Sequence, residues 1–340
     1  MMESVPSESA DMMESVPTDE KTIEAIEQAK EKGKEEKLQR VFNLMDAAAI
    51  FEPLDPPVYL IPLLKIGPGR PSMFAGYGAA GKTIAAQSLA LSVATGKLLW
   101  ESTDKSINYG ETKQTKVIHL DRDQGNVRSR RQYQRLAKSM GIDVRDLDGK
   151  LILSSYPDLT FSNDDLAWAD SLEELILAYK DGDVGPLVIL DAFVGFLGSL
   201  DENNTEAAKP LYKLGELSER TKATFLILHH ARKGTGKEES GNKDAKLSIR
   251  GSSAIFGAID GALILEANRS RGSGVCKVTH EKSPSMKVED FHLQITSTND
   301  SSGTDNGPLH CGMMKESTPT AKKGTSRATT TGTPNKYDDE

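Results

Sequence analysis

The sequence predicts an α/β domain with a mostly parallel, twisted sheet, helices on both faces and antiparallel strands at one edge. The first observation is a motif of the form G-x-x-x-x-G-K-T at 76–83, between a strand-like run at 71–75 and a helical run at 84–94. The second is a series of later runs that are apolar throughout, such as 187–190 and 225–228. Continuous apolar strands indicate burial on both faces, as in a parallel sheet covered by helices.

The segment before this domain is expected to lie outside the fold. Met1–Pro6 recurs as Met12–Pro17, and a six-residue repeat is too short to be a structural unit. We therefore expect residues 1–17 to be disordered. Residues 18–52 read as a charged helical arm, and the middle of this arm is almost entirely lysine and glutamate. The arm is either a solvated linker helix or an oligomerisation arm that packs on a neighbouring subunit.

The domain itself is expected at 53–297. Prolines define an extended approach to the glycine motif, because proline fixes φ and blocks helix formation. Strands are expected at 116–121, 151–155, 187–191, 224–229 and 261–266, with helices near 126–140, 164–180, 205–221 and 251–258. Strands at 275–280 and 291–296 would extend the sheet at its antiparallel edge. Beyond them the chain becomes rich in Ser, Thr, Gly, Lys and Asp, so we expect 298–340 to be a disordered tail.

Each position of the 76–83 motif suits phosphate binding. Glycine at 76 and 81 permits positive φ and a close approach of the backbone to a ligand. The N–H groups of such a loop point inward and bind an anion, and a helix starting near Lys82 adds its positive end. Lys82 supplies a charge for the β- and γ-phosphates, and Thr83 supplies a hydroxyl for Mg²⁺. The predicted nucleotide-binding residues are Gly76, Tyr77, Gly78, Ala79, Ala80, Gly81, Lys82 and Thr83. The alternative is a glycine-rich turn with a solvated lysine.

Acidic residues follow two of the predicted strands, at the edge where parallel sheets gather ligands. Asp191 ends an apolar strand and is predicted to hold Mg²⁺, directly or through water; the alternative is a helix N-cap. Asp121 and Asp123 end the strand at 116–121. Hydrolysis needs a carboxylate that orients and polarises the attacking water, and Asp123 is our choice, with Asp121 as the alternative. At least one of these two acids is expected to cap the helix near Asn126.

Basic residues and histidines suggest further contacts. Arg128, Arg131 and Arg135 are spaced three and four apart, so they share one helix face, which would meet a subunit, DNA or solvent. His229 ends the strand at 224–229, where a polar side chain can sense the γ-phosphate. A long loop rich in glycine and lysine follows at 234–246, and function is a common reason for loops of this length.

Composition and charge narrow the function classes. The chain of 340 residues has a formal net charge of −8, which argues against a strongly basic nucleic-acid protein on the total alone. No apolar run approaches the ~18 residues that span a membrane. The two cysteines, Cys276 and Cys311, lack metal-ligand spacing, and we expect His310-Cys311 to be incidental within the tail. We expect a cytoplasmic protein with no membrane partner.

The chain resembles RecA-fold P-loop ATPases of the RepA-like group, AAA family proteins of mobile elements that are related to the DnaB-type hexameric replicative helicases. The similar segments are Gly76–Thr83, His119–Gln134, 201–203, 218–221, 229–233, 250–256 and 280–282. They span the whole expected domain and neither tail. The resemblance implies a RecA-like sheet and a homo-oligomer, usually a hexamer, with ATP bound between subunits.

The resemblance also implies roles for individual residues. Asp123 takes the place of a catalytic acid that is usually glutamate, and His229 takes the place of the γ-phosphate sensor. Loops 195–209 and 232–249 would line a central channel and contact single-stranded DNA. Relatives often carry Lys-x-Arg near the end of the domain, where this chain has Lys282-Ser283-Pro284. Arg250 and Lys282 are therefore the candidate charges that reach a neighbour's ATP.

Together these observations predict a Mg²⁺-dependent, oligomeric ATPase that acts on DNA, as a helicase or as an ATPase of replication or mobilisation. One alternative is a nucleotide-dependent assembly switch that unwinds nothing. It is favoured by the missing arginine, the acidic N-terminus and the shorter acid at 123. Another alternative is a recombinase-like filament former, because sequence does not decide whether such contacts close into a ring.

Overall fold

The structure is a computed structural model that describes residues 20–42, 44–56, 58–231, 253–268, 273–284, 289–299, 303 and 306–314. Contacts divide the chain into two units, 1–56 and 57–340. The first unit contains helix α1 (Glu20–Phe42) and the short helix α2 (Ala47–Ile50). The side chain of Asp46 accepts a hydrogen bond from the Ala49 amide and thereby caps α2. Residues 1–17 of the predicted disordered segment lie outside the described residues.

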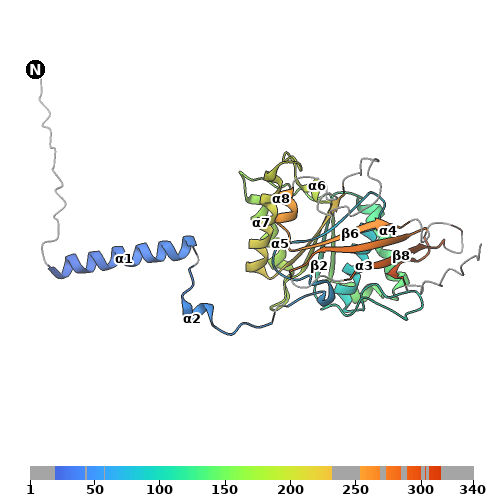
Figure 1. The fold of residues 1–340 in the computed structure, drawn as a ribbon, viewed down its shortest axis with the longest axis horizontal. Helices are drawn as coiled ribbons and strands as arrows, with labels where there is room; N and C mark the ends of the chain where they lie inside the picture. Colours follow the sequence, from blue (N-terminus) through green and yellow to red (C-terminus); the bar gives the residue numbers. More distant parts are fainter. Residues whose placement is uncertain are drawn as a thin grey trace, which may run out of the picture. The chain divides into compact units, whose positions relative to one another are not determined.

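The second unit is an α/β fold around one nine-stranded sheet (Figure 1). Its strands are β1 (Ser72–Gly76), β2 (Val117–Asp121), β3 (Leu151–Ser155), β4 (Leu187–Asp191), β5 (Thr224–His230), β6 (Gly261–Ala267), β7 (Val275–Lys282), β8 (Phe291–Ser297) and β9 (Leu309–Met313). The strand order is β3-β2-β4-β5-β1-β6-β7-β8-β9. The pairs from β3 to β6 are parallel, and those from β6 to β9 are antiparallel. This confirms the predicted fold class.

The helices cover both faces of the sheet. They are α3 (Lys82–Thr95), α4 (Asn126–Ser139), α5 (Ala167–Tyr179), α6 (Phe193–Phe196), α7 (Lys209–Thr221) and α8 (Ser253–Gly257), with 3-10 turns η1 (Pro62–Leu64), η2 (Val144–Leu147) and η3 (Thr205–Ala208). Figure 1 shows α3 and α4 on one side of the strands, and α5, α7 and α8 on the other. Two apolar cores result, one on each face.

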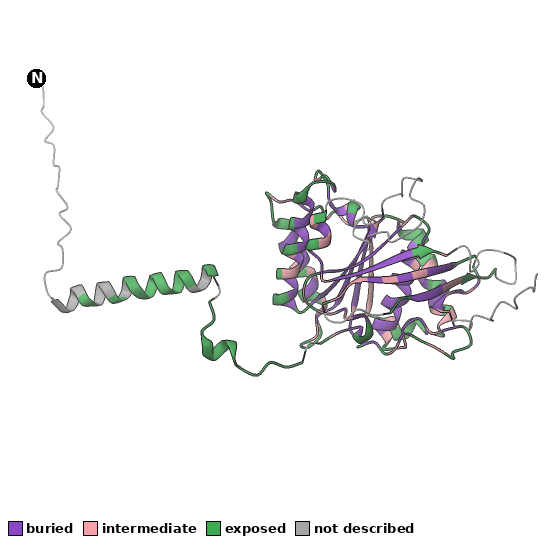
Figure 2. Cartoon of the chain, viewed as in Figure 1, coloured by how far each residue is buried: buried purple, intermediate pink, exposed green. Residues whose placement is uncertain are grey.

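Burial follows the sequence pattern. Strands β1, β2 and β4 are buried at every position, as expected for apolar strands that are covered on both faces. Figure 2 shows the buried residues concentrated in the strands and in the helix surfaces that face them. Helix α3 is also buried along most of its length, because its small residues pack closely on all sides. No helix in the described part of the chain has the length and apolar character needed to cross a membrane.

The far edge of the sheet corrects one prediction. We expected a disordered tail from 298, but β9 pairs antiparallel with β8, and Leu309 and Cys311 are both 4% exposed. Cys311 is therefore part of the core and not incidental. The strand was missed because it is short, lies among polar and glycine residues, and gains its stability from β8, which no local pattern reveals. Residues 315–340 of the predicted tail lie outside the described residues.

Candidate functional site

The glycine motif joins the end of β1 to the start of α3, and its glycines serve different needs. Gly81 has φ +86° and forms the N-cap of α3, and Ala79 also has positive φ, +62°. Gly76 instead lies within β1, between β5 and β6. A Cβ at Gly76 would lie 2.3 Å from the Leu265 carbonyl oxygen. We expected positive φ at 76; the structure shows that glycine is required there by the close approach of the neighbouring strand.

Lys82 and Thr83 begin α3 and are mostly buried. The Lys82 ammonium donates hydrogen bonds to the carbonyl oxygens of Gly76 at 2.9 Å and Tyr77 at 3.0 Å, so the side chain lies along the loop. Burial lowers the pKa of Lys82 below its ordinary value, and the nearby carboxylates of Asp191 and Asp123 partly oppose that shift. Both acids thus lie within electrostatic reach of the lysine.

Asp191 ends β4 and is 1% exposed. Its Oδ2 atom makes no hydrogen bond within the described chain, and His119 Nε2 lies 3.8 Å away. On the other side of that imidazole, Nδ1 lies 2.8 Å from the Tyr133 hydroxyl. A buried carboxylate oxygen with no donor is costly unless a cation compensates its charge. Together with the Thr83 hydroxyl, it provides the hard oxygen ligands that Mg²⁺ prefers, so the residues present fit that ion.

The two acids at the carboxyl end of β2 have different surroundings. The Asp121 carboxylate is fully buried and accepts hydrogen bonds from the amides of Asp123 and Gln124, both at 2.9 Å, and from the Ser129 hydroxyl. Asp121 is therefore committed to holding the turn into α4. Asp123 is exposed and lines the phosphate pocket. Of the two candidates, only Asp123 is placed to meet a ligand there.

These groups line one pocket of about 370 Å³, which we call the phosphate pocket. It joins the carboxyl ends of β1, β2, β4 and β5, which are neighbours in the sheet. The loop contributes Gly78, Ala79 and Gly81, α3 contributes Lys82 and Thr83, and the other strand ends contribute Asp123, Asp191 and His230. Helix α4 adds Arg128 and Gln132, which sequence reasoning did not assign to this site. Their spacing of four residues after an acidic strand end was the available signal.

His229 does not line this pocket in the described structure. It is fully buried and packs edge-on against the Phe193 ring, with the ring centroids 5.7 Å apart. The adjacent His230 is the residue that faces the pocket. Neighbouring residues of a strand point to opposite faces, so a shift of one position exchanges the buried histidine for the half-buried one. Of the two histidines, His230 is therefore the one that lines the phosphate pocket in the described structure.

Of the predicted basic face, all three arginines line a pocket of about 700 Å³ beside the N-terminal end of α4. Arg135 is nevertheless buried, and its guanidinium donates to the Gly307 carbonyl and the Ser297 hydroxyl, both at 2.6 Å. It fixes the connection between β8 and β9, so it is not available to a partner. Arg128 and Arg131 remain exposed.

Arg250 and Lys282 are the two residues predicted to reach the ATP of a neighbouring subunit. Arg250 lies outside the described residues, as does the loop at 232–249. The other predicted loop, 195–209, is described and contains η3. Lys282 ends β7, and its ammonium donates to the carbonyls of Phe256, Gly257 and Ile259 at the end of α8. Because an ammonium has three donors, this contact occupies Lys282 within its own subunit.

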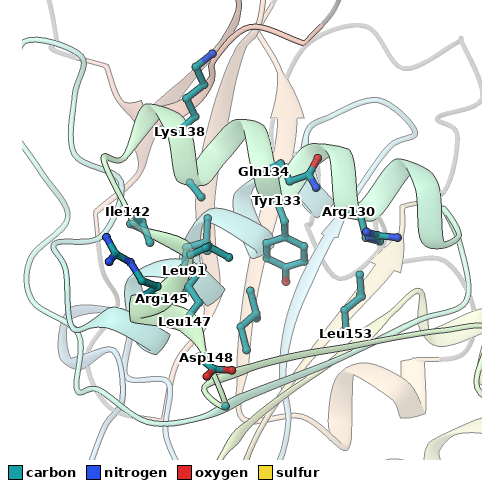
Figure 3. Close-up of a pocket in the computed structure, with 14 residues that line it drawn as sticks. Leu91, Arg130, Tyr133, Gln134, Lys138, Ile142, Arg145, Leu147, Asp148 and Leu153 are labelled. Carbon is teal, nitrogen blue, oxygen red and sulfur yellow. The ribbon is translucent and has the colours of Figure 1, made fainter.

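A larger pocket, of about 880 Å³, lies on another side of α4 between that helix, η2 and the edge strand β3. Figure 3 shows Tyr133 pointing into it from α4, with Leu147 and Leu153 nearby and Arg130 at one end. Its walls are mostly apolar, and none of the acids or loop residues assigned above lines it. The phosphate pocket, although smaller, is the one that Lys82, Thr83, Asp123 and Asp191 line.

The chain is similar to known proteins in family and in fold. A family model described as AAA domain matches residues 34–236. No curated protein matches the chain. Among solved structures, the RadB recombinase aligns with a TM-score of 0.45 and 14% identity over 68% of this chain and 89% of that one. Another solved structure, described as an ATPase domain, aligns with a TM-score of 0.49 and 12% identity over 72% of this chain and 85% of that one. Both are similarities of fold.

Proposed function

Because the chain belongs to the AAA domain family, we propose that its phosphate pocket binds ATP with Mg²⁺ and hydrolyses the β–γ phosphate bond. Membership of that family also confirms the ATP-binding P-loop fold that the sequence resemblance implied. The observation that carries the proposal is that Lys82, Thr83, Asp123 and Asp191 all line one pocket. A phosphate cradle, a pair of metal-ligand oxygens and a free carboxylate are the parts that phosphoryl transfer to water requires.

The residues divide the work as follows. Loop amides and the Lys82 ammonium bind the phosphates, and Lys82 exchanges its carbonyl partners for phosphate oxygens. Asp123 orients a water whose oxygen bonds to the γ-phosphorus while the bond from that phosphorus to the β–γ bridging oxygen breaks. ADP keeps the bridging oxygen, and the water's proton is released to solvent. Thr83 and Asp191 would hold Mg²⁺, which would neutralise part of the phosphate charge.

The experiment is steady-state ATP hydrolysis by the full chain. Lys82→Ala should reduce turnover to background, whereas Lys113→Ala, a change at an exposed lysine away from the pocket, should leave it unchanged. Equal turnover in Lys82→Ala and the wild type would exclude the assigned pocket. A wild type that neither binds nor hydrolyses ATP would exclude the function.

We further propose that the ATPase acts on DNA as a homo-oligomer, as the sequence resemblance implies. The exposed Arg131 and the lysines of loop 232–249 would supply phosphate contacts. If so, single-stranded DNA should raise the ATPase rate, and DNA affinity should fall steeply with salt because bound counterions are released. Absence of both effects would favour the nucleotide-dependent assembly switch. That alternative is also supported by Lys282 and Arg135, because both side chains are hydrogen-bonded within their own chain.

A further inference from the structure

Helix α4 carries three exposed arginines that reach different surroundings. Arg128 lines the phosphate pocket, Arg130 lines the apolar pocket behind the helix, and Arg131 lines only the pocket at the N-terminal end of α4. All three are exposed, and Arg130 lies away from the face that Arg128 and Arg131 share, because a helix turns about 100° per residue. Of the three, only Arg128 lines the phosphate pocket, where the proposed reaction takes place.

The surroundings of Arg128 leave its guanidinium available. It forms no hydrogen bond or ion pair with the side chains of the described chain, although Asp123 and Asp191 line the same pocket. One turn later, Gln132 also faces the pocket, and its Oε1 atom is buried without a hydrogen-bond partner among the described residues. Within the described chain, helix α4 therefore presents an unpaired guanidinium and an unpaired amide oxygen to the pocket in which Asp123 would hold the attacking water.

Building on the proposed ATPase function, we propose that Arg128 is a catalytic residue supplied by the same subunit that binds the ATP. Its guanidinium bonds to γ-phosphoryl oxygens and stabilises the charge that they carry in the transition state, while Gln132 helps Asp123 to hold the water. Apart from Lys82, Arg128 is the described cationic side chain of the pocket that stays charged at neutral pH. Arginine suits this task because its planar fork bonds two phosphate oxygens at once.

If Arg128 acts in the subunit that binds the ATP, the catalytic arginine is present whether or not the chain forms an oligomer. A catalytic arginine can be supplied in cis or by a partner, and either source raises turnover about 10³- to 10⁵-fold in phosphoryl transfer. Here the arginine follows Asp123 by five positions in the same chain, and both line one pocket. Hydrolysis at a single site would then not require a neighbour's arginine.

The test compares Arg128→Ala with Arg130→Ala, its matched control on the other side of the same helix. Arg128→Ala should lower kcat at least about 10³-fold with a small change in KM, and Arg130→Ala should match the wild type. A second readout is binding of ADP with aluminium fluoride, which mimics the transferring phosphoryl group. Arg128→Ala should lose most of the extra affinity for that mimic but retain the affinity for ADP alone. Wild-type values in both assays would overturn the proposal.

A second experiment asks whether Arg128 acts in its own subunit or across an interface. Arg128→Ala and Lys82→Ala chains are coexpressed with different tags and purified as mixed assemblies. An arginine acting in cis predicts turnover no higher than that of Arg128→Ala alone, whereas recovered turnover would show that Arg128 acts across an interface and would overturn the assignment. If the wild type itself fails to hydrolyse ATP, the proposed function fails instead. Normal wild-type turnover with an active Arg128→Ala variant contradicts only this inference.

Discussion

The two glycines at 76 and 78 should respond in opposite ways to the same substitution. An alanine Cβ at Gly76 would lie 2.3 Å from the Leu265 carbonyl oxygen, 0.7 Å inside the 3.0 Å below which real Cβ contacts essentially do not occur. Both partners are strand backbone, so β1 and β6 must separate locally. Overpacking of this kind costs about 1–3 kcal/mol. For a domain of this size we expect Tm to fall by roughly 2–12 °C.

Gly78 provides the contrast, because a Cβ there would meet no protein atom within 4 Å. Gly78 lines the phosphate pocket, however, so the added methyl would take space beside the phosphates. Gly78→Ala should keep the wild-type Tm and weaken ATP binding about tenfold or more, which corresponds to about 1.4 kcal/mol. Thermal unfolding and nucleotide titration of both variants measure this. A Gly76→Ala protein that melts with the wild type, or a Gly78→Ala protein that binds ATP normally, would refute the reasoning.

Three buried groups, Asp191, Arg135 and Cys276, give further predictions. Asp191→Asn should weaken Mn²⁺ binding in the presence of ATP, as measured by electron paramagnetic resonance. It should not lower Tm, because it removes a buried charge that lacks a hydrogen-bond donor at Oδ2. Chelation of divalent ions should stop wild-type turnover. Arg135→Ala should destabilise the fold by about 2–4 kcal/mol in urea titrations, since the guanidinium holds the β8–β9 connection, and an unchanged midpoint would contradict that role. Burial raises the pKa of the Cys276 thiol from 9.0 to about 11. Between those values the unfolded chain has lost a proton that the folded chain retains, so stability should fall as pH rises from about 9, and Cys276→Ala should flatten that slope.

The parallel sheet and the phosphate cradle could be predicted from sequence because each depends on a local pattern. Continuous apolar runs define buried strands, and glycine spacing defines the loop before α3. The acid at the end of β4 was also predictable, since the carboxyl edge of a parallel sheet is where such side chains gather. In each case the decisive information lies within a few residues.

Side-chain direction and distant packing could not be predicted in that way. Two pairs of residues differ in whether the side chain lines the phosphate pocket: Asp123 but not Asp121, and His230 but not His229. The difference depends on the face of the strand or turn on which each side chain lies. The spacing of Arg128, Arg131 and Arg135 places them on one helix face, but only the fold shows that Gly307 and Ser297 bind the last of them. Strand β9 likewise depends on a partner strand that no local window contains.

The two buried acids at neighbouring strand ends show how the fold distinguishes support from chemistry. Asp121 on β2 and Asp191 on β4 are register partners, so their backbones occupy corresponding positions at the end of adjacent strands. Asp121 accepts hydrogen bonds from two amides and a hydroxyl, whereas Asp191 Oδ2 accepts none within the described chain. A buried acceptor without a donor costs about 1–3 kcal/mol, and more when it is charged. A cation bound beside Lys82 and Thr83 would offset that cost at Asp191, as the proposed function requires, whereas the Asp121 carboxylate already has its donors in the turn that it holds.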